Sequence, residues 1–192
     1  MGELLPQAYL YGLIALLGGL AVVIARQVIR VRRDEQILNR LGAGDTRGAS
    51  GSSAEDLYTL ASVQLRKRLY GQASDNLRKA LRLADADPEP EAIALIQNAL
   101  GFSLAAQNNY QASIKHYRAA LKARGDYPVA MNNLAYALEK LDKASESLLL
   151  YRQVLELEPS NRTATKRLRS LERLGVTAES SSSGLGMSPD QP

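Results

Sequence analysis

The longest hydrophobic pattern in the chain lies near its N-terminus. Residues 4–25 form a run of 22 residues without a charge, rich in Leu, Ala, Ile and Val. At about 1.5 Å of rise per residue, a helix of this length spans roughly 33 Å, which matches the hydrocarbon core of a membrane. The run also lacks the polar face that a core helix of a globular domain usually carries. The pattern therefore predicts a transmembrane helix over residues 4–25.

Downstream of this run, the pattern changes to short amphipathic segments that recur every 34 residues. Polar breaks at Asn108-Asn109 and Asp142-Lys143 divide each copy into two segments with apolar residues three and four positions apart. That spacing indicates two helices joined by a turn. A 34-residue helix–turn–helix period resembles the tetratricopeptide repeat. The recurring positions are Leu100, Gly101, Tyr117, Ala120 and Leu121, which return as Leu134, Ala135, Tyr151, Val154 and Leu155.

An earlier copy fits the same pattern once an insert is allowed. It consists of Leu60, Ala61, Tyr70, Ala73, Leu77, Ala80 and Leu81. The spacing from Leu60 to Leu100 is 40 residues instead of 34, so six residues around Asp85 to Pro90 are extra. Two prolines and three acids in that insert predict a loop between units. Gln64 occupies a position where an aromatic residue is usual, so this unit departs most from the repeat pattern.

Helix pairs of this kind bury their apolar faces only by stacking, so an array needs about three units and a polar cap. Residues 162–174 fit the cap, because Leu168, Leu171 and Leu174 share one face and basic residues the other. We therefore predict an all-α fold: a tetratricopeptide-repeat solenoid over residues 54–174, with about three helix pairs plus a C-terminal capping helix, behind the N-terminal transmembrane helix. We expect no sheet.

The charges around the predicted membrane helix indicate its orientation. Arg26, Arg30, Arg32 and Arg33 follow the apolar run, whereas Glu3 is the only charge before it. By the positive-inside rule, the repeats should face the cytoplasm or its chloroplast equivalent. The alternative is a cleaved signal peptide, but no Lys or Arg precedes the run and no small-x-small pattern precedes Arg26.

Three further segments complete the predicted domain organisation. Residues 26–41 continue as a basic juxtamembrane helix with Ile37, Leu38 and Leu41 on one side. Residues 42–53 contain four glycines and three serines, which is typical of a flexible linker. Residues 175–192 contain a run of serines and few large apolar residues, so we expect a disordered tail.

Composition narrows the function classes. The chain has no cysteine and a single histidine, His116, which excludes cysteine-based zinc sites, disulfides and thiol nucleophiles. We expect His116 on a solvated outer face, not in a catalytic site. The net charge of +4 is modest, and basic residues do not alternate with aromatics, so nucleic acid is not expected as a partner. No arrangement of residues indicates an enzyme, a metal site or a cofactor.

In the tetratricopeptide fold, the first helix of each unit lines a concave groove. Carried over by position, the groove residues are Tyr58, Ser62, Asn98, Phe102, Asn132, Tyr136, Glu139 and Lys140. Phe102 and Tyr136 occupy the same repeat position, as do Asn98 and Asn132. Asparagines can bond the backbone of an extended peptide while aromatic faces take its side chains. The alternative is that the aromatics pack between helices and the asparagines bridge neighbouring turns.

Co-chaperones with this fold bind acidic C-terminal tails through a clamp of Lys, Asn, Asn, Lys and Arg. The matching positions here hold Tyr58, Ser62, Ala99, Val129 and Asn133. The cations of the clamp are missing, which argues against such a tail as the ligand.

The chain as a whole resembles the tetratricopeptide photosystem I assembly proteins of cyanobacteria and chloroplasts. The resemblance rests on the N-terminal apolar run with Arg26-Gln27-Val28 and Arg32-Arg33, on the segments Pro90 to Phe102, Tyr127-Pro128 and Asn132 to Ala135, and on Pro159-Ser160-Asn161. It covers nearly everything except the linker and the tail.

The resemblance implies a single-pass thylakoid membrane protein whose repeats face the cytoplasm or stroma. Its partners would be photosystem I subunits or assembly factors, and its role would be scaffolding without a cofactor. A membrane-tethered protein-protein adaptor for another membrane complex would have the same sequence features, and only the partner distinguishes the two.

Overall fold

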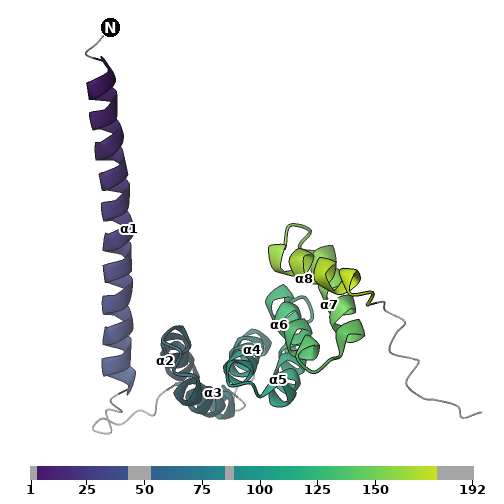
Figure 1. Cartoon of the computed structure of the whole chain (residues 1–192). Coiled ribbons are helices and arrows are strands. Elements are labelled where there is room, and N and C mark those ends of the chain that lie inside the picture. Colours follow the sequence, from purple (N-terminus) through teal and green to yellow (C-terminus); the bar gives the residue numbers. More distant parts are fainter. Residues whose placement is uncertain (1–3, 43–52, 85–88, 177–192) are drawn as a thin grey trace, which may run out of the picture. The chain divides into compact units, whose positions relative to one another are not determined.

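The structure is a computed structural model that describes residues 4–42, 53–84 and 89–176 (Figure 1). The described residues form helices and no strand, in two compact units. The first unit contains α1 (Leu4–Gly42). The second contains α2 (Ala54–Arg66), α3 (Tyr70–Ala84), α4 (Pro90–Ala106), α5 (Tyr110–Ala123), α6 (Pro128–Glu139), α7 (Ala144–Leu157) and α8 (Arg162–Arg173).

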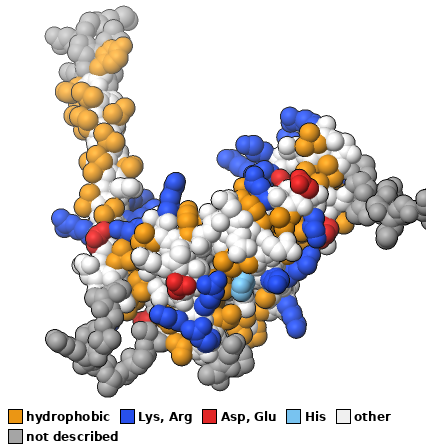
Figure 2. Space-filling view, turned by 60° about the horizontal axis from the view of Figure 1, so that its bottom comes forward, with side chains coloured by type: hydrophobic (Ala, Val, Ile, Leu, Met, Phe, Trp, Pro, Cys, Tyr) orange, Lys and Arg blue, Asp and Glu red, His pale blue; other side chains and the backbone are white. Residues whose placement is uncertain are grey.

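α1 is one continuous helix of 39 residues. The predicted membrane segment 4–25 and the predicted juxtamembrane segment 26–41 both lie within it, with no break between them. Its large apolar side chains are exposed, for example Leu16 at 65% and Val23 at 63%. Figure 2 shows these hydrophobic side chains along the helix. By length and composition, residues Tyr9–Leu41 could cross a membrane.

The predicted linker and tail fall mostly outside the described residues. Gly42 is the last residue of α1, and Ser53 is the N-cap of α2, whereas residues 43–52 are not described. Of the predicted tail, Gly175 and Val176 are described and residues 177–192 are not. The expectations of flexibility and disorder for these segments stay predictions.

The predicted all-α repeat array is confirmed. α2 with α3, α4 with α5 and α6 with α7 form three helix pairs, and α8 packs on α7 as a cap. From α2 to α8, each helix contacts the next along the chain, and the first helices also contact one another, α2 with α4 and α4 with α6 (Figure 1). The first helices therefore lie side by side, as the repeat pattern requires.

Each pair is closed by a small residue facing a large one. Ala61, Gly101 and Ala135 occupy the same repeat position, and none of the three is exposed. Gly101 lies so close to the buried ring of Tyr117 that a Cβ there would stand 2.7 Å from Cδ1. Such a contact is closer than van der Waals packing allows, so this position limits how near the two helices of the pair can come.

The turn between the two helices of each pair uses a left-handed residue. Arg68, Asn108 and Asp142 have φ values of 60°, 62° and 57° and occupy the same repeat position. The next residue donates back into the first helix in each pair, as in the 2.8 Å bond from Leu69 N to the Gln64 carbonyl. Asparagine and aspartate tolerate this conformation better than arginine does, so the turn after α2 is the most strained of the three.

The first pair compensates for its unusual residue with hydrogen bonds. Gln64, which stands where the pattern usually has an aromatic, is 5% exposed. Its Oε1 accepts a 2.9 Å bond from Asn76 Nδ2, and its Nε2 donates to Gln72 Oε1 at 3.4 Å. α2 and α3 are therefore joined by a buried amide pair where an apolar contact is usual.

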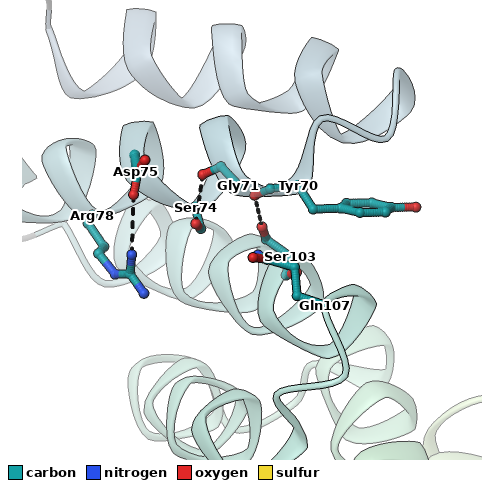
Figure 3. Close-up of polar contacts among 7 residues, drawn as sticks. All are labelled: Tyr70, Gly71, Ser74, Asp75, Arg78, Ser103 and Gln107. Atoms are coloured by element: carbon teal, nitrogen blue, oxygen red, sulfur yellow. Dashed lines mark hydrogen bonds and ion pairs between the residues drawn. The ribbon is translucent and has the colours of Figure 1, made fainter.

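The first and second pairs are joined by a buried hydroxyl. Ser103 on α4 is fully buried and donates a 2.7 Å bond to the carbonyl of Tyr70, at the start of α3 (Figure 3). The carbonyl of Ser103 in turn accepts a bond from Gln107. The bond from Ser103 to Tyr70 holds the C-terminal half of α4 against the beginning of α3.

The predicted loop around the insert needs a correction. The sequence pattern assigns Pro90 to the loop, but Pro90 is the first residue of α4, and Glu89 is the N-cap. Proline is well tolerated there, because the first helical N–H has no partner in the helix. α4 is therefore about one turn longer than α6, which has 12 residues against 17 in α4. Residues 85–88 lie outside the described part of the chain.

Replacing Arg68 by Gly should stabilise the repeat unit by about 1 kcal/mol, because glycine adopts positive φ without the Cβ clash. For a domain of this size, that corresponds to a melting temperature higher by roughly 4 °C, measured by circular dichroism. Asn108→Gly is the matched control and should change the melting temperature less. A melting temperature that falls in Arg68→Gly would show that the turn is not strained.

Deleting residues 1–33 should leave a soluble domain with the helicity of α2 to α8. The physical reason is that the buried clusters of the repeats are built from residues of α2 to α8 alone. Gel filtration and circular dichroism test this directly. An aggregated product of low helicity would mean that the repeats need the N-terminal helix in order to fold.

Candidate functional site

The candidate site is the surface formed by the first helices, α2, α4 and α6. Of the residues expected there, Phe102 and Lys140 are exposed, and the others are half-buried: Tyr58, Ser62, Asn98, Asn132, Tyr136 and Glu139. All of them lie on these helices except Lys140, the C-cap of α6. Peptide binding by these residues stays a prediction, but the structure shows how far each is already engaged within the chain.

Both the nitrogen and the oxygen of the Asn98 amide are hydrogen-bonded at the junction of the second and third pairs. Its Nδ2 donates to the phenol oxygen of Tyr127 at 3.2 Å, and its Oδ1 accepts from Asn133 Nδ2 at 3.0 Å. Asn98 thus connects α4 to the start of α6. Among the sequence-based alternatives, the geometry of Asn98 is that of a bridge between neighbouring units.

Tyr127 lies beside Asn98 at the candidate site, although the repeat pattern does not predict it there. Arg124 lies over its ring, with Cζ 4.9 Å from the centroid, and the same guanidinium bonds Glu91 Oε1 at 2.7 Å. Burial raises the pKa of Tyr127, and the neighbouring phenol of Tyr58 adds to that shift. The neutral phenol can therefore act as both acceptor and donor. Tyr127 precedes a helix-starting proline, and nothing in the apolar pattern marks it as a bridge.

Asn132 repeats part of this arrangement one unit later. Its Nδ2 lies 3.4 Å from Asn161 Oδ1, and Asn161 also caps α8 by accepting from Ala164 N at 3.0 Å. The Oδ1 of Asn132 is buried and has no hydrogen-bond partner among the described residues. Asn132 therefore retains one acceptor that a ligand N–H could use if the side chain rotates.

Tyr136 is surrounded by other side chains. Its ring makes an edge-to-face contact with the ring of Tyr110, with 6.4 Å between the two centroids. Cζ of Arg167 lies 4.9 Å from the centroid of Tyr136, and Nζ of Lys140 lies 5.4 Å from it. Cation–π contacts at these distances are favourable. Phe102, at the same repeat position, remains 43% exposed. Phe102 is therefore the aromatic of this pair with more of its surface free for a ligand.

Glu139 on α6 forms an ion pair with the capping helix α8. Its side chain is only 16% exposed, and Oε2 lies 3.3 Å from NH1 of Arg167 on α8. Burial and the nearby Glu139 carboxylate raise the pKa of Tyr151 above its usual range. Because Glu139 links α6 to α8, it has little surface left to offer to a partner.

The expected solvated position of His116 needs a correction, whereas the expectation that it is not catalytic stays a prediction. It is half-buried, and its Nδ1 lies 2.7 Å from Gln97 Oε1 on α4, so it does not lie on a solvated outer face. Burial lowers the pKa of His116, and the neighbouring Arg78 and Lys115 lower it further. A half-buried polar ring needs a hydrogen-bond partner, and Gln97 supplies it.

The basic residues of α1 lie toward its C-terminal end. Arg26, Arg30, Arg32 and Arg33 are all exposed. Exposed arginines beyond an apolar stretch fit the orientation predicted from the sequence, which stays a prediction. Within the described residues there is no group of three or more His, Asp or Glu side chains that could hold a metal ion.

Comparison with protein families and solved structures confirms the repeat fold. A tetratricopeptide-repeat family model matches residues 129–161. The first tetratricopeptide domain of Spaghetti (RPAP3), solved with an HSP90 peptide, superposes with a TM-score of 0.57 at 24% identity, over 63% of this chain and 91% of that one. MamA superposes with a TM-score of 0.59 at 16% identity, over 78% of each chain. At these identities the similarity shows the fold alone.

Three sequence relatives are proteins of Cyanophora paradoxa, Guillardia theta and Arabidopsis thaliana. The Ycf37 protein of Cyanophora paradoxa is 33% identical over 123 residues, which covers 64% of this chain and 70% of that protein. The Ycf37 protein of Guillardia theta is 29% identical over 171 residues, 89% of this chain and 94% of that protein. The chloroplast tetratricopeptide protein PYG7 of Arabidopsis thaliana is 31% identical over 170 residues, 86% of this chain.

The matched regions differ in extent among these relatives. This chain spans about half of PYG7, 54%, but most of the two Ycf37 proteins. A match over 89% of the chain also extends well beyond the repeats, which begin at α2 and end at α8. With the repeat fold and this degree of identity, the chain belongs to the family of tetratricopeptide-repeat proteins that contains Ycf37 and PYG7.

Proposed function

We propose that this protein is a membrane-anchored scaffold that binds protein partners through its repeats and assists the assembly or stability of photosystem I at the thylakoid membrane. The observation that carries the proposal is the family similarity over both the repeats and the region before them. The photosystem I assignment rests on the resemblance of the segments from Pro90 to Phe102 and from Asn132 to Ala135 to that assembly family. The chloroplast location of one relative supports the thylakoid.

In this proposal α1 crosses the thylakoid membrane once, and the repeats face the cytoplasm or stroma. Support comes from the length and apolar surface of α1 and from the arginines at its C-terminal end. Anchoring confines the repeats near partly built membrane complexes. A weak contact then suffices, because tethering raises the effective concentration of the binding surface.

Binding is assigned to the surface of α2, α4 and α6. Phe102 supplies exposed aromatic surface, and Lys140 supplies an exposed cation beside Tyr136. Two of the solved relatives in fold hold peptides of HSP90 and HSP70. Acidic tails of that kind are not proposed here, because Tyr58, Ala99 and Val129 occupy positions where the clamp needs polar or basic groups.

The alternative function is a membrane-tethered adaptor for another membrane complex. A pull-down of the tagged, full-length protein from its native membranes in a gentle detergent distinguishes the two, with residues 1–53 alone as the control. We expect photosystem I subunits or assembly factors to be enriched over that control by mass spectrometry. Enrichment of a different complex would reject the photosystem I role and leave the scaffold architecture intact.

Replacing Phe102 by Ala should reduce partner capture by about tenfold, as is typical for truncation of an aromatic anchor. Because this side chain is 43% exposed, helicity and melting temperature should change little. Leu149→Ala on α7 is the matched control, since Leu149 is 45% exposed and lies on a second helix. Equal loss of capture in both variants would show that the first helices are not the binding surface.

A further inference from the structure

The three junctions between successive units differ at one equivalent position. Tyr58, Asn98 and Asn132 hold the same place on the first helix of each pair. Asn98 is bonded by Tyr127 and Asn132 by Asn161, and these two partners are also equivalent, since each precedes the next helix. Two of the three junctions are thus closed by a polar side chain from the following unit.

The first junction is not closed in this way. The residue equivalent to Tyr127 and Asn161 is Ile93, which has no polar group to offer, and Tyr58 makes no hydrogen bond to another described residue. In place of a bridge there is a pocket of about 480 Å³. Its volume is within the range of pockets that bind ligands.

The pocket lies beside the start of α4. The helix begins one turn earlier than α6, which adds Glu89 and Ala92 to the wall, and α3 contributes Leu83 and Ala84 at its end. The lining is mainly apolar: Ala54, Tyr58, Leu83, Ala92, Leu95 and Ile96. Leu83 is 47% exposed although it lines the pocket, so apolar surface is open to a ligand there.

The remaining lining residues are acidic. Glu55 and Glu89 are exposed and line the pocket, and neither makes an ion pair with another described residue. The pocket thus combines an apolar lining with unpaired negative charge, in a chain whose net charge is +4.

We propose that this pocket, between α2, the end of α3 and the start of α4, binds a bulky apolar side chain flanked by Lys or Arg in an extended segment of a partner protein. The apolar lining accepts the side chain, and Glu55 and Glu89 pair with the flanking cations. The inference deepens the proposed scaffold function, on which it rests, by naming the chemistry of the bound segment. It also explains why this junction lacks the polar bridge of the other two.

The test uses the full-length protein in nanodiscs of zwitterionic lipid, so that basic peptides do not bind the membrane itself. Three fluorescent peptides serve as probes in anisotropy titrations at low salt: Gly-Ser-Gly-Lys-Leu-Lys-Gly-Ser-Gly, the same peptide with Ser for Leu, and the same with Glu for both Lys. Replacing Leu by Ser should weaken binding about tenfold or more, as loss of a buried leucine predicts. The Glu-flanked peptide should bind more weakly than the Lys-flanked one.

Variants assign the binding to the pocket. Ala92→Trp should fill it and abolish binding, whereas Ala119→Trp on α5 adds the same bulk elsewhere and should not. The double variant Glu55→Gln with Glu89→Gln should remove the preference for Lys over Glu, and Glu156→Gln on α7 is its control. Neither glutamate makes an ion pair with another described residue, and Glu89 makes no side-chain cap bond, so the fold should persist.

Several results would overturn the proposal. Equal binding of the Lys- and Glu-flanked peptides would do so, as would full binding to Ala92→Trp. Binding that appears only after residues 85–88 are replaced by Gly and Ser would assign the pocket to the chain's own insert. Self-association that Ala92→Trp abolishes would assign it to a second copy. Since the peptides are independent of the native partner, failure here leaves the pull-down result, and hence the scaffold function, unaffected.

Discussion

The close approach of the two helices within each pair is the contact on which the rest of the array depends. It is seen at Gly101, opposite the buried ring of Tyr117, and the small residues Ala61 and Ala135 hold the same repeat position. At Gly101 the helix backbone is so near Tyr117 that even a methyl group would collide. Because interiors are close-packed, this spacing limits how near the two helices of a pair can come, and the pairs so formed stack on one another. The surface formed by the first helices is a product of that stacking.

The repeats could be predicted well from the sequence because small and large apolar residues recur in them at fixed intervals. The 34-residue period located the three pairs and the cap, and the structure confirms them. Polar residues carried much less information. Gln64 marked the first unit as irregular, but nothing in the apolar pattern indicated that Asn76 would bond it across to α3. Partners twelve or more residues apart depend on helix rotation, which the pattern fixes only coarsely.

The candidate site shows the same limit more sharply. The repeat pattern predicted which residues lie on the first helices. It could not predict that residues at the same repeat position differ in how exposed they are. Phe102 is open, whereas its equivalent Tyr136 lies between Arg167, Lys140 and Tyr110. The difference comes from the element that succeeds each unit, because α8 packs against the third pair and brings Arg167 to Tyr136. A residue's neighbours along the stack thus decide whether a groove position is free.

The first junction, which contains the insert, also shows that the following unit decides whether a position on the first helix is free. Where the period is kept at 34 residues, each junction places a polar side chain against the preceding first helix, as Tyr127 does at Asn98. Such a bridge stabilises the stack but occupies the surface. At the first junction the equivalent residue is Ile93, which cannot form the bridge, and apolar surface lies beside Glu55 and Glu89, which make no ion pair with another described residue. In the proposed membrane-tethered scaffold, confinement would compensate for weak contacts at this surface, and the two bridged junctions hold the array together.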